Sequence, residues 1–332
     1  MKASVIGGGT WGSTFALHLS RLNIETNLWI REQEILQETA KERENRVFLP
    51  GYKFPQMVSF HDDFEEAVRH CEVVFIAVPS KFCRQIYKKL APFLSSDQTL
   101  VSLTKGIEEN SLMRMSEVME DEFNPFFRPR IAALSGPSFA QEVAQCHPTA
   151  VVLASKEMDL AKKIQHVISS ENLRVYTSDD IIGVELGGAL KNIIAIAAGI
   201  LDALHFGSNS TAALITRGLS EITRLGVRLG ARKETFSGLA GVGDLVLTCT
   251  GRLSRNRHIG YELGKGKPLK EIVSGMKMVA EGITTTVSAR QLARREHVEM
   301  PICEQVYQVL YNNKDPKHAL QDLMTRRLKE EY

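Results

Sequence analysis

The sequence has few cysteines and no excess of charge of either sign. Its 332 residues include five cysteines, which are scattered and form no Cys-x-x-Cys pair. This pattern excludes a disulfide framework and a zinc site of the usual spacing, and it suits a reducing cytoplasm. Lys and Arg number 41 against 39 Asp and Glu, without a run of like charges. We therefore expect no nucleic-acid partner and no attraction to an anionic membrane surface.

Long apolar runs are also missing. The longest uncharged apolar run, from Asn192 to Leu201, is too short to cross a bilayer. The N-terminus MKASVIGGG leads directly into a strand, without the apolar stretch of a signal peptide. We expect neither a membrane segment nor a signal peptide. What the chain does have is 43% hydrophobic residues, over a length that favours two domains.

Short β-branched apolar runs alternate with helical patterns in the first half of the chain. This alternation is typical of a parallel sheet built from strand–helix–strand units, hence of an α/β fold. From about Asp179 long helical patterns take over, across residues 181–204 and 210–229. The expected strands are residues 3–6, 26–30, 73–78, 99–103, 131–134, 150–154 and 174–176.

A glycine-rich loop follows the first of these strands. Gly7, Gly9 and Gly12 stand in a GxGxxG spacing between a strand and a helix. Such glycines permit a tight turn, close approach of the backbone to a pyrophosphate, and close packing of helix on strand, while the helix N-terminus offers N–H groups to the anion. We therefore expect a doubly wound, mostly parallel Rossmann-type sheet that binds NAD(P) in residues 1–178, and an all-helical substrate-binding and catalytic domain in residues 179–332.

The residue at the end of the second strand bears on the coenzyme. Folds specific for NAD place an acid there for the ribose 2′-hydroxyl, whereas this chain has Arg31, nineteen residues after Gly12, followed by Glu32. An arginine matches a 2′-phosphate, so NADP(H) is favoured, while Glu32 keeps NAD(H) open. A solvated surface arginine is the alternative explanation.

Lys191 is the one positive charge in the stretch ELGGALKNIIAIAAGIL, residues 185–201. Two explanations are open at this point. The lysine can lay its stem on the core and keep its ammonium in water. Alternatively, the small residues around it bring a ligand close to the helix, and a partly desolvated lysine with a shifted pKa does proton chemistry on that ligand.

Further polar residues follow strand ends or lie in the helical half. Each has an ordinary alternative, such as a surface cation, a helix cap or a solvated loop. Together they supply two lysines, one acid, one arginine and several hydroxyl or amide donors, without a metal-binding cluster or a Ser/His/Asp or Cys/His set. This inventory suits hydride transfer to the carbonyl of a small phosphorylated substrate. The residues are Lys105, the segment 135–140, Lys191, Asn192, Asp244, Thr248, Ser254, Arg255 and Asn256.

Several motifs occur in an order that resembles one family. They are GGGTWG, AVPS, TKGIE, SGPSFA, ELGGALKNIIAIAAGI, ALITRGLSEI, GLAGVGDLVLTCT, SRNR and VAEG. From residue 3 to about residue 310, the chain is similar to the NAD(P)-dependent glycerol-3-phosphate dehydrogenases of the bacterial kind. The resemblance implies interconversion of dihydroxyacetone phosphate and sn-glycerol 3-phosphate in the cytoplasm, supply of phospholipid synthesis, and commonly a homodimer.

The resemblance also implies roles for individual residues. Lys191 would accept the proton in the oxidative direction, Asp244 would orient it, and Lys105 would stabilise the developing alkoxide. The implied substrate contacts are Lys105, Gly136, Ser138, Lys191, Asp244, Ser254, Arg255 and Asn256. The implied cofactor contacts are Thr10, Trp11, Arg31, Lys105, Ala140, Arg255, Val279 and Glu281. No metal is expected.

Two other functions stay open. The β-hydroxyacid dehydrogenases also join a Rossmann domain to a helical domain that carries a lysine, so a small carboxylate is the nearest alternative substrate. A nucleotide-sensing protein without turnover is the other alternative, although the set of acid, base and anion-binding residues argues against it.

Overall fold

The N-terminal part of the chain forms one eight-stranded sheet in the computed structural model, which describes residues 1–276, 279–328, 330 and 331. The strand order is β3-β2-β1-β4-β5-β6-β7-β8, and all neighbours are parallel except β6 and β7, which are antiparallel. The strands are β1 (Lys2–Ile6), β2 (Glu25–Trp29), β3 (Val58–His61), β4 (Val73–Ile76), β5 (Thr99–Ser102), β6 (Arg130–Ser135), β7 (Thr149–Ala154) and β8 (Leu173–Ser178).

Both faces of the sheet are buried beneath helices. Consecutive side chains of a strand point to opposite faces, so each strand contributes to two cores. In β4, Val73 and Phe75 lie in one core and Val74 and Ile76 in the other. One face packs on α1 (Thr10–Arg21), α6 (Ala140–Ala144) and α7 (Met158–Ile168). The other packs on α3 (Phe64–Val68), α4 (Ser80–Leu90) and α5 (Met115–Phe123). Two further elements are α2 (Gln33–Glu42) and the short η1 (Ala91–Phe93).

All seven expected strands are present, but the sequence pattern did not predict β3. This strand is four residues long, pairs only with β2, and lies at the edge of the sheet. Its sequence VSFH offers one fully buried residue, Val58. So short a pattern has too few apolar positions to indicate a strand, and the hydrogen bonds that define it come from its neighbour.

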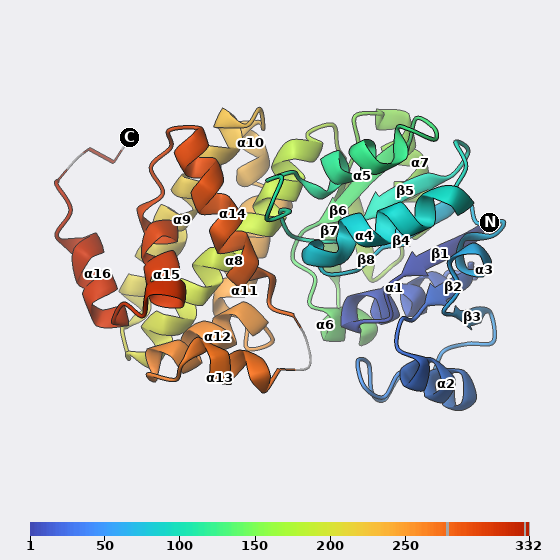
Figure 1. Ribbon diagram of the computed structural model, residues 1–332, viewed down its shortest axis with the longest axis horizontal. Helices are drawn as coiled ribbons and strands as arrows, with labels where there is room; N and C mark the ends of the chain where they lie inside the picture. The colour runs from blue at the N-terminus through green and yellow to red at the C-terminus, as the bar shows by residue number, and fades with distance from the viewer. Residues whose placement is uncertain (277–278, 329, 332) are drawn as a thin grey trace.

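The C-terminal part is helical and packs around α8 (Ile181–Ala203) (Figure 1). The Asp180 side chain begins this helix by accepting a hydrogen bond from Gly183 N at 2.9 Å. Nearly every residue of α8 is buried beneath its neighbours. The remaining elements are α9 (Ser208–Arg228), α10 (Lys233–Phe236), the π-helical η2 (Leu239–Gly243), α11 (Asp244–Thr250), α12 (Arg255–Gly264), α13 (Leu269–Ser274), α14 (Glu281–Arg295), α15 (Pro301–Asn312) and α16 (Pro316–Met324). A mostly parallel sheet followed by helices confirms the expected fold class.

Helix α8 is long and apolar enough to cross a membrane by length and composition alone, with a mean hydropathy of 1.6 over its most apolar window. However, 89% of that window is buried inside the protein. The central helix of a globular helical domain has the same composition, since it is apolar all round. We therefore interpret α8 as the core of the helical domain.

Candidate active site

The glycine-rich loop between β1 and α1 has the geometry of a nucleotide cradle. Gly7 has φ +122°, and a Cβ there would lie 2.6 Å from Ala77 O. A Cβ on Gly12 would lie 1.8 Å from Gly7 O, so both positions require glycine. A Cβ on Gly9, by contrast, would meet nothing within 4 Å. The loop is therefore closed against the protein and open at Gly9, which fits the approach of a pyrophosphate.

The other predicted residues of this loop lie at the start of α1. Thr10 is its first residue, and Trp11 is half-buried with its ring 5.8 Å from that of Phe15. Ala140 begins α6 and lies beside α1, because Ala140 O accepts a hydrogen bond from Thr14 Oγ1 at 3.3 Å. The start of α6 thus lies beside the second turn of α1, and the N-terminus of α1 itself offers N–H groups to an anion.

Arg31 is exposed just beyond β2. Arg31 Nε donates to Glu32 Oε1 at 2.8 Å, and Arg31 Cζ lies 5.6 Å from the ring centroid of Phe82. The two residues that give opposite indications about the coenzyme are therefore paired with each other. The guanidinium remains accessible to a 2′-phosphate, since 61% of its side chain is exposed.

The centre of the site is a carboxylate between two ammonium groups. Asp244 begins α11, and its side chain is 1% exposed. Lys191 Nζ, from α8, lies 2.7 Å from Asp244 Oδ1, and Lys105 Nζ, from the loop after β5, lies 2.7 Å from Asp244 Oδ2. The structure therefore brings together the three predicted catalytic residues, from the sheet domain and the helical domain.

Electrostatics at this centre suit proton transfer. Burial lowers the pKa of Lys191 to about 8, because the ammonium loses hydration; Asp244 opposes the shift and Lys105 adds to it. Burial also disfavours the Asp244 carboxylate, but the two ammonium groups outweigh it and lower the pKa of that residue. Asp244 is thus ionised at neutral pH, while Lys191 titrates close to neutrality and can both donate and accept a proton.

The glycines before Lys191 allow α8 to approach the sheet domain. A Cβ on Gly188 would lie 2.3 Å from Ser135 Oγ at the end of β6, and 3.5 Å from Lys105 Cγ. A Cβ on Gly187 would lie 2.3 Å from Ala240 O in η2. Small residues here therefore bring Lys191 next to Lys105 and Asp244. The ammonium is buried, with 8% of its side chain exposed, so the snorkelling explanation is wrong.

Thr248 and the two predicted asparagines organise the helices around this centre. Thr248 Oγ1 accepts a hydrogen bond from Lys191 Nζ at 2.5 Å and donates to Asp244 O at 2.6 Å. Asn256 Nδ2 donates to Asn192 Oδ1 at 2.9 Å, and Asn256 Oδ1 accepts from Gly282 N at 2.9 Å. These buried side-chain contacts link α8, α12 and α14, so the amides of both asparagines already have protein partners.

The remaining predicted residues surround the three charges. Gly136 has φ +125°, and its carbonyl accepts hydrogen bonds from Lys105 Nζ at 2.8 Å and from Ser138 Oγ at 2.9 Å. Ser254 begins α12 as its cap, with Ser254 Oγ accepting from Arg257 N at 3.2 Å. The Ser138 hydroxyl therefore lies beside Lys105, whereas the Ser254 hydroxyl is used by the helix.

Arg255, Val279 and Glu281 form a second junction between the domains. Arg255 is exposed, and its Nη1 donates to Val279 O at 3.2 Å. Glu281 begins α14 and reaches the sheet domain, where Glu281 Oε1 accepts from Ser80 N at 2.9 Å and its second carboxylate oxygen accepts from Ser80 Oγ. The start of α4 is thereby attached to the helical domain. Ser80 was not singled out in the sequence, although it belongs to the AVPS motif.

A third contact between the domains is buried and was not predicted from the sequence. The carboxylate of Glu185, on α8, accepts hydrogen bonds from Arg114 Nη1 at 2.5 Å and from Ser116 N at 2.8 Å. An acid inside an apolar helix is as conspicuous as Lys191 six residues later, and the same reasoning could have identified it.

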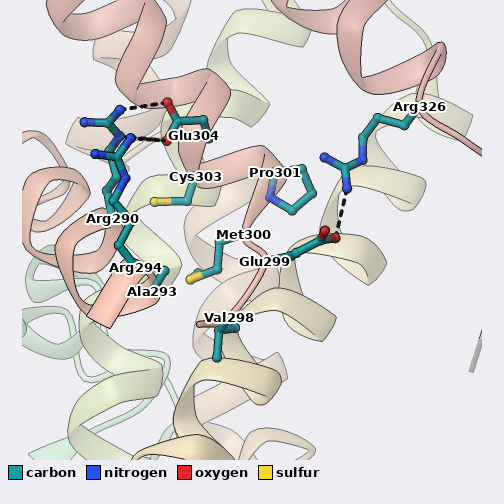
Figure 2. A pocket seen from close by; sticks show the side chains of 10 residues that line it. All are labelled: Arg290, Ala293, Arg294, Val298, Glu299, Met300, Pro301, Cys303, Glu304 and Arg326. Atoms are coloured by element: carbon teal, nitrogen blue, oxygen red, sulfur yellow. Dashed lines mark hydrogen bonds and ion pairs between the residues drawn. The ribbon is translucent and has the colours of Figure 1, made fainter. Parts of the chain in front are cut away.

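Figure 2 shows a cavity that contains none of the predicted site residues. It lies between the end of α14 and the start of α15. Arg290 Nε there lies 2.6 Å from Glu304 Oε2, and Arg326 Nη2 lies 3.0 Å from Glu299 Oε2. Its arginines are thus already paired with carboxylates. Within the described ranges, no three His, Cys, Asp or Glu side chains gather to hold a metal ion.

Comparison with known proteins agrees with this geometry. Sequence profiles of the N-terminal and C-terminal parts of NAD-dependent glycerol-3-phosphate dehydrogenase match residues 2–161 and 180–321. A protein of Citrifermentans bemidjiense named glycerol-3-phosphate dehydrogenase (NAD(P)+) is 51% identical over 330 residues, covering 99% of this chain and 98% of that protein. A protein of the same name from Syntrophobacter fumaroxidans is 49% identical, covering 98% and 96%.

A solved structure is similar over the whole fold. The crystal structure of glycerol-3-phosphate dehydrogenase from Coxiella burnetii superposes with a TM-score of 0.94 at 39% identity, covering 98% of this chain and 99% of that one. Together with the two profile matches, this similarity shows that the chain belongs to the family of NAD-dependent glycerol-3-phosphate dehydrogenases.

Proposed function

We propose that this protein interconverts dihydroxyacetone phosphate and sn-glycerol 3-phosphate, using a nicotinamide dinucleotide. The observation that carries the proposal is the pair of ammonium groups at 2.7 Å on either side of the buried Asp244 carboxylate. A carbonyl reduced beside them needs a proton donor and a positive charge for the developing alkoxide, and the pair supplies both. Membership of the family speaks against the two alternatives, a β-hydroxyacid dehydrogenase and a nucleotide sensor.

The division of labour between the domains is part of this proposal. Residues 1–178 would bind the nucleotide, and residues 179–332 would bind the substrate and carry most of the catalytic groups. The open cradle at Gly9 and the glycine-only positions beside it support the first assignment. When bound, the nicotinamide supplies or accepts the hydride. The residues that would hold the whole dinucleotide are Gly7, Gly9, Thr10, Trp11, Gly12, Arg31, Lys105, Ala140, Arg255, Val279 and Glu281.

The chain's own residues would move the proton. In the reductive direction, Lys191 Nζ donates a proton to the carbonyl oxygen and becomes a neutral amine, which water then reprotonates. In the oxidative direction the amine accepts the hydroxyl proton. Asp244 holds Lys191 in place, and Lys105 would stabilise the developing alkoxide. Around them, the substrate contacts would be Gly136, Ser138, Asn192, Thr248, Ser254, Arg255 and Asn256.

A direct assay tests this function. Absorbance of the reduced nicotinamide is followed with dihydroxyacetone phosphate, once with NADPH and once with NADH. We expect turnover with the phosphorylated ketone. Turnover of 3-hydroxyacids without activity on dihydroxyacetone phosphate would establish the carboxylate-using alternative. Nucleotide binding without turnover of either substrate class would establish a sensor.

Arg255→Ala should raise KM for dihydroxyacetone phosphate and lower kcat/KM by roughly ten- to hundred-fold. Arg255 is an exposed residue, and its guanidinium can present a planar fork to two phosphate oxygens, an interaction of about 1.5 to 3 kcal/mol. Binding at the non-reacting phosphate also orients the carbonyl, so kcat falls with affinity. Steady-state kinetics with dihydroxyacetone phosphate and with dihydroxyacetone measure this effect. The unphosphorylated ketone should react poorly with the wild type, and the substitution should change its kinetics little.

Arg252→Ala is the matched control, since it removes the same charge from an exposed residue three positions before Arg255. It should leave KM close to the wild-type value. Coenzyme Kd must be measured for both variants, because Arg255 also contacts Val279 O near the predicted cofactor position. If Arg255→Ala impaired the two ketones alike after that correction, Arg255 would not bind the phosphate.

We further propose NADP(H) as the favoured coenzyme. Arg31→Ala should weaken the binding of NADPH by about 1.5 to 3 kcal/mol, the range of a hydrogen bond to a charged group, and should leave the binding of NADH nearly unchanged. Fluorescence titration of both coenzymes measures this difference. Glu32→Gln is the control, because it removes the carboxylate that binds Arg31 and should keep or strengthen NADPH binding. Equal weakening of NADPH and NADH by Arg31→Ala would assign the arginine to support of the loop.

We also propose a cytoplasmic homodimer that supplies phospholipid synthesis. Five unpaired cysteines support a reducing compartment. Large apolar side chains exposed on the helical domain, such as Phe206 at 41% and Met324 at 76%, are available for association. Light scattering coupled to gel filtration measures the oligomeric state, and a monomer at micromolar concentration would contradict the dimer.

A further inference from the structure

Two buried charges outside the active centre connect the domains beside it. Arg114 and Glu185 are 8% and 7% exposed, although charged residues rarely lie inside a protein. Glu185 Oε2 accepts from Arg114 Nη1 at 2.5 Å and from Ser116 Oγ at 2.6 Å, while Glu185 Oε1 accepts from Ser116 N at 2.8 Å. One carboxylate of the helical domain thus receives three donors from the start of α5 in the sheet domain.

Each partner is attached to one of the two active-site lysines. Glu185 precedes Lys191 by six residues on α8, which is about 9 Å along a helix axis. Arg114 is attached to the segment that carries Lys105, because it forms an isolated antiparallel bridge with Ile107, two residues after Lys105, and Glu108 N donates to Met113 O at 2.9 Å. The ion pair therefore fixes the loop of one lysine to the helix of the other.

We propose that the Arg114–Glu185 ion pair is a positioning device that holds Lys105 of the sheet domain against Asp244 and Lys191 of the helical domain. Asp244 and Lys191 lie on α11 and α8, which pack directly on each other, so their contact does not depend on the domain junction. The position of Lys105 relative to Asp244, in contrast, depends on the domain junction. The inference rests on the proposed function, because it explains how the two lysines are kept at one reacting oxygen.

Loosening the junction has a predictable electrostatic consequence. The titratable groups that face Lys191 are Asp244, Lys105 and the Cys249 thiol. If Lys105 withdraws and water enters, Lys191 loses a repulsive neighbour and regains hydration, while Asp244 stays in contact. Both changes raise the pKa of Lys191 from about 8 towards its usual range. In the reductive direction, activity requires protonated Lys191, so the alkaline limb of the pH–rate profile moves to higher pH.

Glu185→Gln tests this role, because it removes the charge and keeps the size of the side chain. We expect kcat/KM for dihydroxyacetone phosphate to fall roughly ten- to hundred-fold, the scale of a misplaced catalytic group. The alkaline limb should move to higher pH, and NADPH Kd should remain at the wild-type value. A wild-type pH profile and kcat, with only a lower Tm, would overturn the proposal, since that result describes a purely structural pair.

Glu108→Gln is the matched control. Glu108 lies on the same loop and pairs with Arg84 at 2.9 Å, but this contact stays within the sheet domain. It should lower Tm without moving the pH profile. If Glu185→Gln does not fold, the double variant Arg114→Met/Glu185→Leu replaces the pair with apolar groups, which buried sites often tolerate. An unaltered pH profile in that folded double variant would also overturn the proposal.

One measurement needs no turnover at all. NMR titration of the Lys191 Nζ in wild type and in Glu185→Gln reports the pKa of Lys191 directly. Its upward shift in the variant would support the positioning role even if dihydroxyacetone phosphate were the wrong substrate. Conversely, wild-type activity on dihydroxyacetone phosphate with no shift would keep the function and reject the positioning role.

Discussion

Lys191→Met should lower turnover of dihydroxyacetone phosphate by roughly 10² to 10⁴, the contribution of a positioned proton donor. The fold should survive, because Lys191 lies in the apolar core of the helical domain and methionine is a flexible apolar side chain of similar length. Asp244 should keep Lys105 as an ion-pair partner in the variant, since the two groups are 2.7 Å apart in the wild type. Nucleotide affinity should also be retained, since the glycine loop is in the other domain.

The pH dependence makes this prediction specific. With the pKa of Lys191 at about 8, the wild-type rate of reduction should fall as pH rises through that value, because the lysine loses the proton that it must donate. The rate of oxidation should rise over the same range, because the neutral amine is then the base. In Lys191→Met, this pH dependence should be absent from both the reduction and the oxidation. Near-normal turnover in the variant, or an unchanged limb, would remove Lys191 from the proton-transfer role.

The fold was largely predictable because its pattern is repeated many times along the chain. The buried parallel strands are rich in apolar residues, most clearly VVFI of β4, because both faces of the sheet are covered. The edge strand β3 was missed because only one neighbour stabilises it and four residues carry too little pattern. The antiparallel pairing of β6 with β7, which are connected through α6, also leaves no distinct signal in composition.

The site was predictable where a residue contrasts with its surroundings. Lys191 stands alone as a cation in an apolar helix, and the structure explains the glycines beside it by the close approach of Ser135 and Ala240. Pairing over long sequence distances was not predictable. Glu185 stands out as an acid in an apolar helix, but Arg114 is 71 residues away, and only the fold identifies it as the partner. Likewise, only the structure shows Arg31 bound to its neighbour Glu32.

Asp244→Asn should lower the rate of reduction about as much as Lys191→Met, because it removes the counter-charge of the lysine. The neutral amide leaves the Lys105 and Lys191 ammonium groups facing each other in a buried site without a counter-charge. Their repulsion and the lost Coulomb attraction both lower the pKa of Lys191 further below about 8. Lys191 then carries its proton less often at physiological pH and is no longer held by the carboxylate, so the rate of reduction should fall by up to the roughly 10² to 10⁴ that a positioned proton donor contributes.

Stability should fall as well, because removing one partner of a buried ion pair costs about 3 to 5 kcal/mol. Asp202→Asn, at the end of α8, which carries Lys191, is the matched control. Asp202 Oδ2 lies 2.8 Å from Arg257 Nη2, but 48% of the Asp202 side chain is exposed, and its loss should cost less than about 1 kcal/mol. Denaturant unfolding separates the two variants.

The pH–rate profile of Asp244→Asn tests the mechanism. The alkaline limb of reduction should move to lower pH in Asp244→Asn, opposite to the shift expected for Glu185→Gln. If Asp244→Asn kept both its turnover and the wild-type position of the limb, the carboxylate would not control the protonation of Lys191, and the two lysines would have to act independently of it.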